Sequence, residues 1–334
     1  MDQRGKTMEQ AGVAAFGVTE QGEAVRRVLL ERDGFRVSVL TLGAVLQGVW
    51  LPGRAKSLTL GSDKVADYQG MMRHHGALIA PVINRFSAAR APIGGVLHGF
   101  EANLDGRLTL HSGAAGTQFK TWALVAARPD AATLTLTLPE DEGGFPGTRR
   151  IAVTYALTGV LTLRMSVRAE TDRLTLMNPA NHSYWNLDGT ETWAGHQLRL
   201  AADQYLPTDA DFAPTGEIRP VAGSPMDFRD CRQIEPGAPA LDNCFCLGTA
   251  RVPLREVLWL NGRSGVTMSL ATTEAGVQLY DGRAAFRPGH GPYEGLAIET
   301  QNWPDAPNHP GFPSIELAPG EVLEQVTEWR FGQV

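Results

Sequence analysis

Residues 132–138 of this chain read ATLTLTL, a run in which leucines alternate with threonine hydroxyls. Successive side chains of a β-strand point to opposite faces of its sheet, so such a run buries one face and exposes the other. The same period of two recurs in IAVTYAL at 151–157, VLTLRMSV at 160–167, HQLRL at 196–200, VTMSL at 266–270 and GLAIE at 295–299. The pattern predicts a protein built mostly of half-buried strands.

Turn signals separate these predicted strands along the chain. The sequence holds 37 glycines and 21 prolines, and residues 141–147 read DEGGFPG, which is typical of a turn. No long segment carries apolar residues at helical spacing, and neither an internal repeat nor a low-complexity linker divides the chain. We therefore expect an all-β fold, a large sandwich of antiparallel sheets, in a single domain over residues 1–334. The first 20 residues or so are expected to be loose.

The composition favours a globular protein that handles a small neutral compound. Of the 334 residues, 43% are hydrophobic and 20% are charged, and the formal net charge is −6 at pH 7. This balance argues against a nucleic-acid partner, because binding to a phosphate backbone needs a basic surface. No window approaches the roughly 20 apolar residues that a membrane span needs, so we expect no membrane partner.

The cysteines and the N-terminal residues both favour the cytoplasm. Cys231, Cys244 and Cys246 are too few, and odd in number, for a disulfide framework, so we expect reduced thiols. No second pair of ligands stands at zinc-site spacing, and we expect no metal site. Residues 1–18 lack the continuous apolar stretch of a signal peptide. The expected location is therefore cytoplasmic.

Two segments place polar residues where a strand pattern predicts burial. In NHSYWN at 181–186, His182 is either a hydrogen-bonded core residue or a positioned acid–base group. In LAIETQ at 296–301, the alternation turns Glu299 away from Leu296 and Ile298. A buried glutamate is either half of a structural ion pair with an arginine or a general base whose pKa desolvation has raised. The residues alone leave both choices open.

A series of short blocks, in a fixed order, gives the chain a family resemblance. From about Gly17 to Phe331 the chain resembles the aldose 1-epimerase (galactose mutarotase) family, whose fold is a large antiparallel β-sandwich. The matching blocks are Gly61-Ser62, Asp67-Tyr68, Ile83-Asn84-Arg85-Phe86, Leu110-His111-Ser112-Gly113, Phe145-Pro146-Gly147, NHSYWNL at 181–187, LDNCF at 241–245, GVQLY at 276–280 and ETQNWPDAPN at 299–308.

The resemblance implies roles for seven residues. By this match Glu299 is the general base and His182 is the acid that protonates the ring oxygen of a sugar. The resemblance also implies that five further residues bind the substrate, namely Asn84, Arg85, His111, Asp242 and Gln278. His98 is a rival for the place of His111, because it too follows a leucine and precedes a glycine. The spacing to Asn84-Arg85 and to Asn103 favours His111.

The reaction that the resemblance implies is the exchange of the α and β anomers of a free aldose such as galactose or glucose. One group takes the proton of the C1 hydroxyl, another protonates the ring oxygen, and the open chain rotates about C1–C2 before closing again. A carboxylate and a histidine suffice for these steps, with no metal and no cofactor. Trp185 or Trp303 is expected to cover the apolar face of the sugar.

Other residues receive structural interpretations or depart from the family pattern. His74-His75 is read as a loop pair without a role, and His196 as an exposed residue at the start of a strand. Ala80-Pro81 stands where the family carries Gly-Arg, Ser112 replaces a glycine, and Asp281 replaces a small hydroxyl residue. All three departures are expected near the pocket, where they would bear on the preferred sugar.

Three alternatives accompany the epimerase prediction. A glycosidase or lyase on a similar sandwich would need two carboxylates flanking the bond that is cleaved. A non-catalytic sugar sensor would have lost His182 or Glu299, and both are present. A hexose-phosphate epimerase would need extra cations in the pocket, for which Arg283 and Arg287 are candidates. The expected partner is a small-molecule sugar, bound by a monomer or a weak homodimer.

Overall fold

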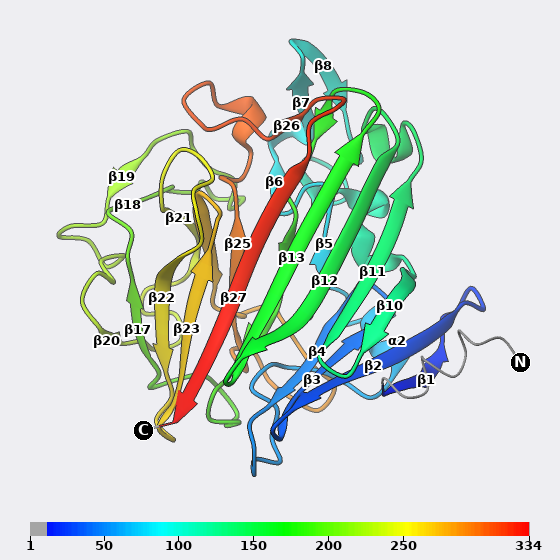
Figure 1. The fold of residues 1–334 in the computed structure, drawn as a ribbon. Helices are drawn as coiled ribbons and strands as arrows, with labels where there is room; N and C mark the ends of the chain where they lie inside the picture. The colour runs from blue at the N-terminus through cyan, green and yellow to red at the C-terminus, as the bar shows by residue number, and fades with distance from the viewer. Residues whose placement is uncertain (1–11, 334) are drawn as a thin grey trace, which may run out of the picture.

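The largest element of the fold is a nine-stranded antiparallel sheet, which crosses the front of Figure 1. The computed structural model describes residues 12–333. In spatial order the strands are β10 (Ala123–Arg128), β11 (Ala131–Leu138), β12 (Arg149–Gly159), β13 (Thr162–Thr171), β27 (Leu323–Gln333), β23 (Val266–Thr272), β22 (Arg255–Asn261), β17 (Gln197–Leu200) and β20 (Arg232–Gln233). The C-terminal strand β27 lies in the middle, between β13 and β23.

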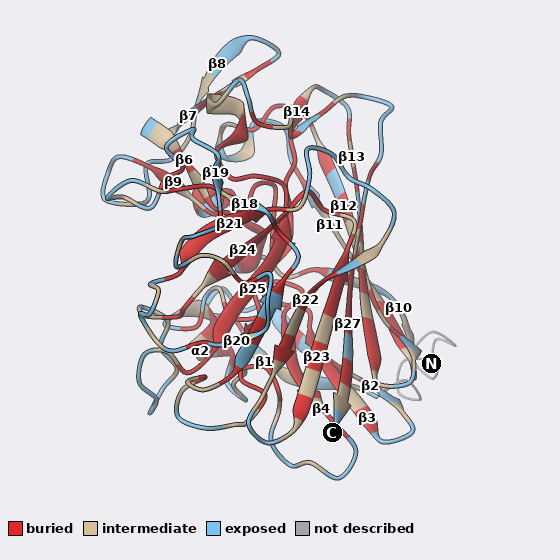
Figure 2. Cartoon of the chain, turned by 90° about the vertical axis from the view of Figure 1, so that its left-hand side faces the viewer, coloured by how far each residue is buried: buried red, intermediate tan, exposed pale blue. Residues whose placement is uncertain are grey.

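A six-stranded antiparallel sheet forms the second layer. Its order is β16 (Tyr184–Trp185), β25 (Leu296–Gln301), β24 (Gly276–Tyr280), β21 (Asp242–Cys246), β18 (Gln204–Tyr205) and β19 (Arg219–Pro220). Figure 2 shows β21, β24 and β25 as a largely buried layer beside the strands of the nine-stranded sheet.

The N-terminal strands form a third, four-stranded sheet. It runs in sequence order through β1 (Val13–Val18), β2 (Ala24–Arg32), β3 (Phe35–Leu40) and β4 (Leu46–Trp50). Four two-stranded pairs complete the strands, namely β14 (Thr175–Leu176) with β26 (Glu316–Leu317), β15 (Ala180–Asn181) with β5 (Leu78–Ile79), β6 (Arg85–Phe86) with β9 (Thr109–Leu110) and β7 (Arg90–Ile93) with β8 (Val96–Gly99).

Helices are short in the described part of the chain. They are α2 (Val65–Gln69) and the 3-10 helices η1 (Ser87–Ala89), η2 (Gly113–Ala115), η3 (Thr117–Phe119), η4 (Glu142–Gly144) and η5 (Ala306–Asn308). Within residues 12–333 we find no helix with the length and apolar character needed to cross a bilayer.

One hydrophobic core joins the three large sheets. Val37 of β3, Leu134 of β11 and Val153 of β12 pack in the same cluster as Leu279 of β24 and Ile298 of β25. Side chains from facing sheets interdigitate in this way in a β-sandwich. The predicted fold class, a large antiparallel β-sandwich, is therefore confirmed.

The alternating runs become strands, with small shifts at their ends. Residues 132–138 lie inside β11, whose Leu134 stands opposite Val153 of β12. The run at 160–167 starts two residues early, because Val160 and Leu161 form the turn before β13. Of the N-terminal residues expected to be loose, Val13–Val18 form β1, and residues 1–11 lie outside the described part.

Candidate functional site

Strand β25 has two chemically different faces. Leu296 and Ile298 point into the core between the sheets, as the alternation predicts. Glu299 lies on the opposite face and is 2% exposed. The sheet register sets Gln278 of β24 directly beside Glu299. The outer face of this sheet therefore collects polar side chains at one place.

His182 meets Glu299 at this face. It lies between β15 and β16, and its backbone N–H donates to the carbonyl of Ala77. Its Nε2 lies 3.3 Å from Oε1 of Glu299, and both side chains are at most 5% exposed. Two residues that are 117 positions apart in the sequence thus share one buried contact.

Burial shifts the pKa of both groups toward their neutral forms. Desolvation, helped by the nearby charge of Asp242, raises the pKa of Glu299 well above its usual range. Desolvation lowers the pKa of His182 to about 4, and the charge of Arg85 acts in the same direction. The neutral carboxyl group carries a proton that the neutral imidazole can accept. Transfer of this proton across the contact gives a carboxylate and an imidazolium.

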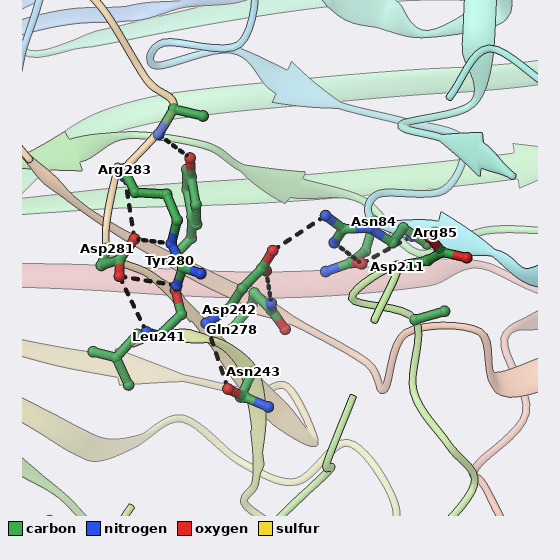
Figure 3. Close-up of polar contacts among 12 residues, drawn as sticks. Asn84, Arg85, Asp211, Leu241, Asp242, Asn243, Gln278, Tyr280, Asp281 and Arg283 are labelled. Carbon is green, nitrogen blue, oxygen red and sulfur yellow. Dashed lines mark hydrogen bonds and ion pairs between the residues drawn. The ribbon is translucent and has the colours of Figure 1, made fainter. Parts of the chain in front are cut away.

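Arg85 and Asp242 form the second polar pair of the site (Figure 3). Nη2 of Arg85 lies 3.1 Å from Oδ2 of Asp242. The amide of Gln278 donates to Oδ1 of the same carboxylate at 2.7 Å. Asn84 accepts the backbone N–H of Arg85 through Oδ1 at 2.9 Å. Asp242 is therefore held from two sides, and Arg85 is oriented by two neighbours.

His111 enters the site from the loop after β9. Its Nδ1 accepts the backbone N–H of Asn84 at 3.1 Å. Burial lowers the pKa of His111 well below its usual value, so the ring is neutral at pH 7 and its proton must stand on Nε2. Its ring centroid lies 5.3 Å from that of His182. The rival, His98, lies on β8 and does not line this pocket.

These residues surround a cavity of about 260 Å³. Six of the seven predicted site residues line it, namely Asn84, Arg85, His111, His182, Asp242 and Glu299. Gln278 lies behind Asp242 and supports it rather than lining the cavity. The cavity also has apolar walls, from Leu110, Tyr184, Phe212, Tyr280 and Ala284. Polar groups that converge on a partly apolar hollow are typical of a small-molecule site.

The sequence analysis gave no place in the site to the lining residues His74 and Phe212. His74, read as part of a loop pair, lies with its ring centroid 4.7 Å from His111 and 5.9 Å from His182. Phe212, in the loop after β18, faces the two guanidinium groups of Arg85 and Arg283. Neither lies in one of the matching sequence blocks or in an alternating strand, so no sequence pattern pointed to it.

Two expectations about aromatic and histidine residues are wrong. Trp185 is fully buried between the sheets and packs against Trp329, while Trp303 is 1% exposed and donates its indole N–H to the carbonyl of Ala275. Neither can cover a sugar. His196 is not exposed but fully buried, where its Nε2 accepts the backbone N–H of Leu187 at 3.0 Å.

The three departures from the family pattern are all buried positions. Ser112 exchanges hydrogen bonds with the backbone of Val82, and Ala80 is buried. Asp281 is fully buried and binds Arg283, which does line the cavity. None of the three lines the cavity itself.

Comparisons with known proteins agree with this arrangement. Residues 26–330 match the family model described as aldose 1-epimerase. The chain is 30% identical to galactose mutarotase of Homo sapiens, over 95% of this chain and 97% of that protein. It is 29% identical to aldose 1-epimerase of Escherichia coli (strain K12), over 93% of this chain and 96% of that protein.

Solved structures show the same architecture. An aldose epimerase homologue from C. elegans superimposes with a TM-score of 0.85 at 28% identity, over 92% of this chain and 99% of that one. A galactose 1-epimerase from Lactobacillus acidophilus NCFM superimposes with a TM-score of 0.83 at 25% identity, over 96% and 98% of the two chains. By sequence and by fold, the chain belongs to the aldose 1-epimerase family.

Proposed function

We propose that this protein is an aldose 1-epimerase, which interconverts the α and β anomers of a free aldose such as galactose or glucose. The observation that carries the proposal is the 3.3 Å approach of His182 Nε2 to Glu299 Oε1 in a lined cavity. The relatives that cover nearly the whole chain bear the names galactose mutarotase and aldose 1-epimerase, which supports the same reaction.

The proton that passes between Glu299 and His182 suits this chemistry, because the reaction needs one group that takes a proton and one that gives a proton. With the proton on His182, the Glu299 carboxylate takes the proton of the C1 hydroxyl while the imidazolium gives its own to the ring oxygen. The C1–O5 bond then breaks, and C1 becomes an aldehyde. After rotation about C1–C2 the same transfers run in reverse, so the enzyme ends with the proton it started with. No electron leaves or enters the sugar.

The other polar residues bind and orient the substrate in this proposal. Arg85 and Asp242 offer a donor and an acceptor side by side, which matches the vicinal hydroxyls of a sugar. The Nε2–H of neutral His111 is a further donor, because its Nδ1 is occupied by the N–H of Asn84. Tyr184 and Tyr280 supply apolar surface from two neighbouring parts of the wall.

A glycosidase fits the cavity less well. Asp242 is the second carboxylate that lines it, but Arg85 and Gln278 bind both of its oxygens. A nucleophile or general base of that class needs an oxygen free to attack or to take a proton. Asp242 is better suited to holding hydroxyls than to cleaving a bond.

We also propose a reducing, cytoplasmic setting and a monomer or weak homodimer. All three cysteines are free thiols, with Cys244 and Cys246 buried and Cys231 exposed. Free exposed thiols are typical of reducing compartments. Sedimentation of the purified protein over a range of concentrations would test the oligomeric state.

The test of the epimerase proposal is polarimetry on freshly dissolved α-D-galactose and α-D-glucose. We expect the protein to speed the approach to rotational equilibrium in proportion to its concentration, without changing the final rotation. Arabinose and xylose extend the panel to pentoses. If no aldose reaches equilibrium faster with the protein than with heat-denatured protein, the proposal is wrong.

A further inference from the structure

The turn before β5 fixes His74 beside the segment that carries His182. The backbone N–H of Gly76 donates to the carbonyl of His182 at 2.9 Å, and the N–H of His182 donates to the carbonyl of Ala77 at 2.9 Å. Strand β5 then pairs with β15, which directly precedes His182. The side-chain amide of Asn181 adds a third link, because it donates to the carbonyl of Gly76 at 2.7 Å. The contacts that place His182 therefore place His74 as well.

The ring of His74 packs against both histidines of the predicted site. Its centroid lies 4.7 Å from that of His111, with the two planes 52° apart. It lies 5.9 Å from the centroid of His182, with the two planes only 26° apart. All three side chains line the cavity. Three imidazole rings thus form one part of the cavity wall.

The two ring nitrogens of His74 have different surroundings. Within residues 12–333 neither has a hydrogen-bond partner, but only Nδ1 is closed off from solvent. Because the side chain lines the cavity, its open Nε2 is the nitrogen that a bound molecule can reach. A few polar groups that face a partly apolar hollow are what orients the ligand in most small-molecule sites.

Burial keeps the ring of His74 neutral. Desolvation lowers the pKa of His74 well below its usual value, and the charge of His182 acts in the same direction. A neutral imidazole carries one proton, on either Nδ1 or Nε2. Buried N–H groups without an acceptor are rarer in proteins than buried acceptors without a donor. The proton therefore belongs on Nε2, and His74 presents an N–H donor to the cavity.

The next residue, His75, shows how a structural histidine differs in this turn. His75 is 3% exposed, packs against Tyr184 with ring centroids 4.3 Å apart, and does not line the cavity. Its Nε2 is fully enclosed, whereas that of His74 is open. Two adjacent histidines thus lie in different environments, and only the first of them can contact a ligand.

We propose that His74 is a third substrate-binding histidine, which donates a hydrogen bond from Nε2 to an oxygen of the bound sugar on the side that faces His111 and His182. It contacts the substrate directly and takes no part in proton transfer. The contact is made before and during ring opening alike, so it contributes to binding rather than to the chemical step. The proposal rests on the epimerase function and adds to it a residue that lies in none of the matching sequence blocks.

The experiment measures KM and kcat for galactose by polarimetry in three variants of His74. His74→Phe keeps a ring of similar size but removes both nitrogens, so we expect KM to rise about three- to tenfold, the worth of one neutral hydrogen bond, while kcat stays within about twofold. His74→Gln carries its amide nitrogen near the position of Nε2 and should restore most of the wild-type KM. His74→Asn reaches only as far as Nδ1, so its KM should stay raised.

The matched control is His98→Phe. It makes the same change on β8, outside the cavity, and should keep the wild-type KM. Thermal unfolding of each variant shows whether it is folded. If His74→Phe does not fold, the comparison of His74→Gln with His74→Asn carries the test, because the two differ by one methylene group.

Three results would overturn the proposal. The first is a wild-type KM in His74→Phe, and the second is equal KM values in His74→Gln and His74→Asn. The third is a fall in kcat with KM unchanged, because His74 would then act through His182 and not on the sugar. If the wild type turns over no aldose, the epimerase proposal fails and this one fails with it. An active wild type with an unaffected His74→Phe overturns only the role of His74, so the two failures are distinguishable.

Discussion

At the scale of single residues, the proposed reaction depends most on Glu299, the proposed general base. Removing its proton-accepting oxygen should cut kcat by about 10²- to 10⁴-fold, the usual contribution of a general base. Glu299→Gln is close in shape, so KM should change by no more than about threefold. Polarimetry on galactose measures both values.

The matched control is another buried glutamate. Glu274 is fully buried and its pKa is raised by desolvation, but it pairs with Arg251 and does not line the cavity. Glu274→Gln should keep the wild-type kcat per folded molecule. If the two variants lose activity equally, loss of a buried carboxyl, and not of the base, explains the effect.

A second prediction concerns His75 and the dependence of protein stability on pH. It packs against Tyr184 with ring centroids 4.3 Å apart, and burial lowers its pKa to about 3. In the unfolded chain its pKa returns to about 6.5. Below pH 6.5 the unfolded chain therefore binds a proton that the folded chain does not, and stability falls as the pH falls until it reaches about 3.

His75→Gln should remove this part of the pH dependence. Between pH 6 and pH 4 the free energy of unfolding of the variant should fall less steeply than that of the wild type, by about 1.4 kcal/mol per pH unit. Urea unfolding at several pH values measures the two slopes. Parallel slopes would mean that His75 takes up its proton equally in both states.

The sequence predicted some site residues and missed others for a physical reason. His182 and Glu299 stand in strand-like segments where a polar residue interrupts an apolar pattern, so each draws attention locally. His74 and Phe212 lie in loops, and only the folded chain brings them to the cavity. The prediction that Trp185 covers a sugar failed because its large ring fits equally well on either face of a strand. In the structure the ring packs in the hydrophobic core.

At the scale of elements, the turn at Phe145-Pro146-Gly147 shows why a motif can be structural. Arg149, at the start of β12, is fully buried and donates through Nη1 to the carbonyls of Phe145 and Gly147. Through Nη2 it donates to the carbonyl of Glu142 at 3.3 Å. One side chain thus satisfies the backbone of a whole loop, which packing alone would leave unpaired.

Arg149→Met should therefore destabilise the protein. It keeps most of the apolar volume but leaves buried carbonyls without donors, at a cost of about 3 kcal/mol. Equilibrium urea unfolding measures the change. The control Arg150→Met lies on the next residue of β12, which is exposed, and should change the stability by less than about 0.5 kcal/mol. Equal effects of the two variants would contradict the role of Arg149.

The strands themselves were predictable because alternation is a local property. Residues 132–138, 151–157 and 266–270 all fall inside strands of the structure. The residue at which a strand begins or ends is harder to predict, because it depends on the conformation of the adjoining turn. Leu161 adopts a φ of 47° and leaves the strand, although its side chain fits the alternating pattern.

At the scale of the whole molecule, the order of the strands could not be predicted from the sequence. Strand β27 comes last in the chain, yet it pairs with β13 on one side and β23 on the other. Such pairings depend on contacts between residues more than fifty positions apart, for which one sequence carries no local signal. The six-stranded sheet, which carries Glu299, shares its core with this central strand.

That shared core makes a final prediction about cooperativity. Trp329 of β27 is 1% exposed, and its ring centroid lies 5.8 Å from that of Trp185, next to the site residue Tyr184. Trp329→Ala should lower the stability by about 3–5 kcal/mol. Because both sheets bury side chains in one core, activity and tryptophan fluorescence should be lost together within each protein. The wild type and the variant should each show one common urea midpoint, and that of the variant should be lower.

The control is Val160→Ala, in the turn before β13, where the side chain is 87% exposed and the midpoint should not move. Activity lost at clearly lower urea than fluorescence would mean that the six-stranded sheet unfolds apart from the nine-stranded one. The two sheets would then belong to separate cooperative folding units. Coincident midpoints that move together in Trp329→Ala would instead tie the His182–Glu299 pair to a strand that lies in the other layer of the sandwich.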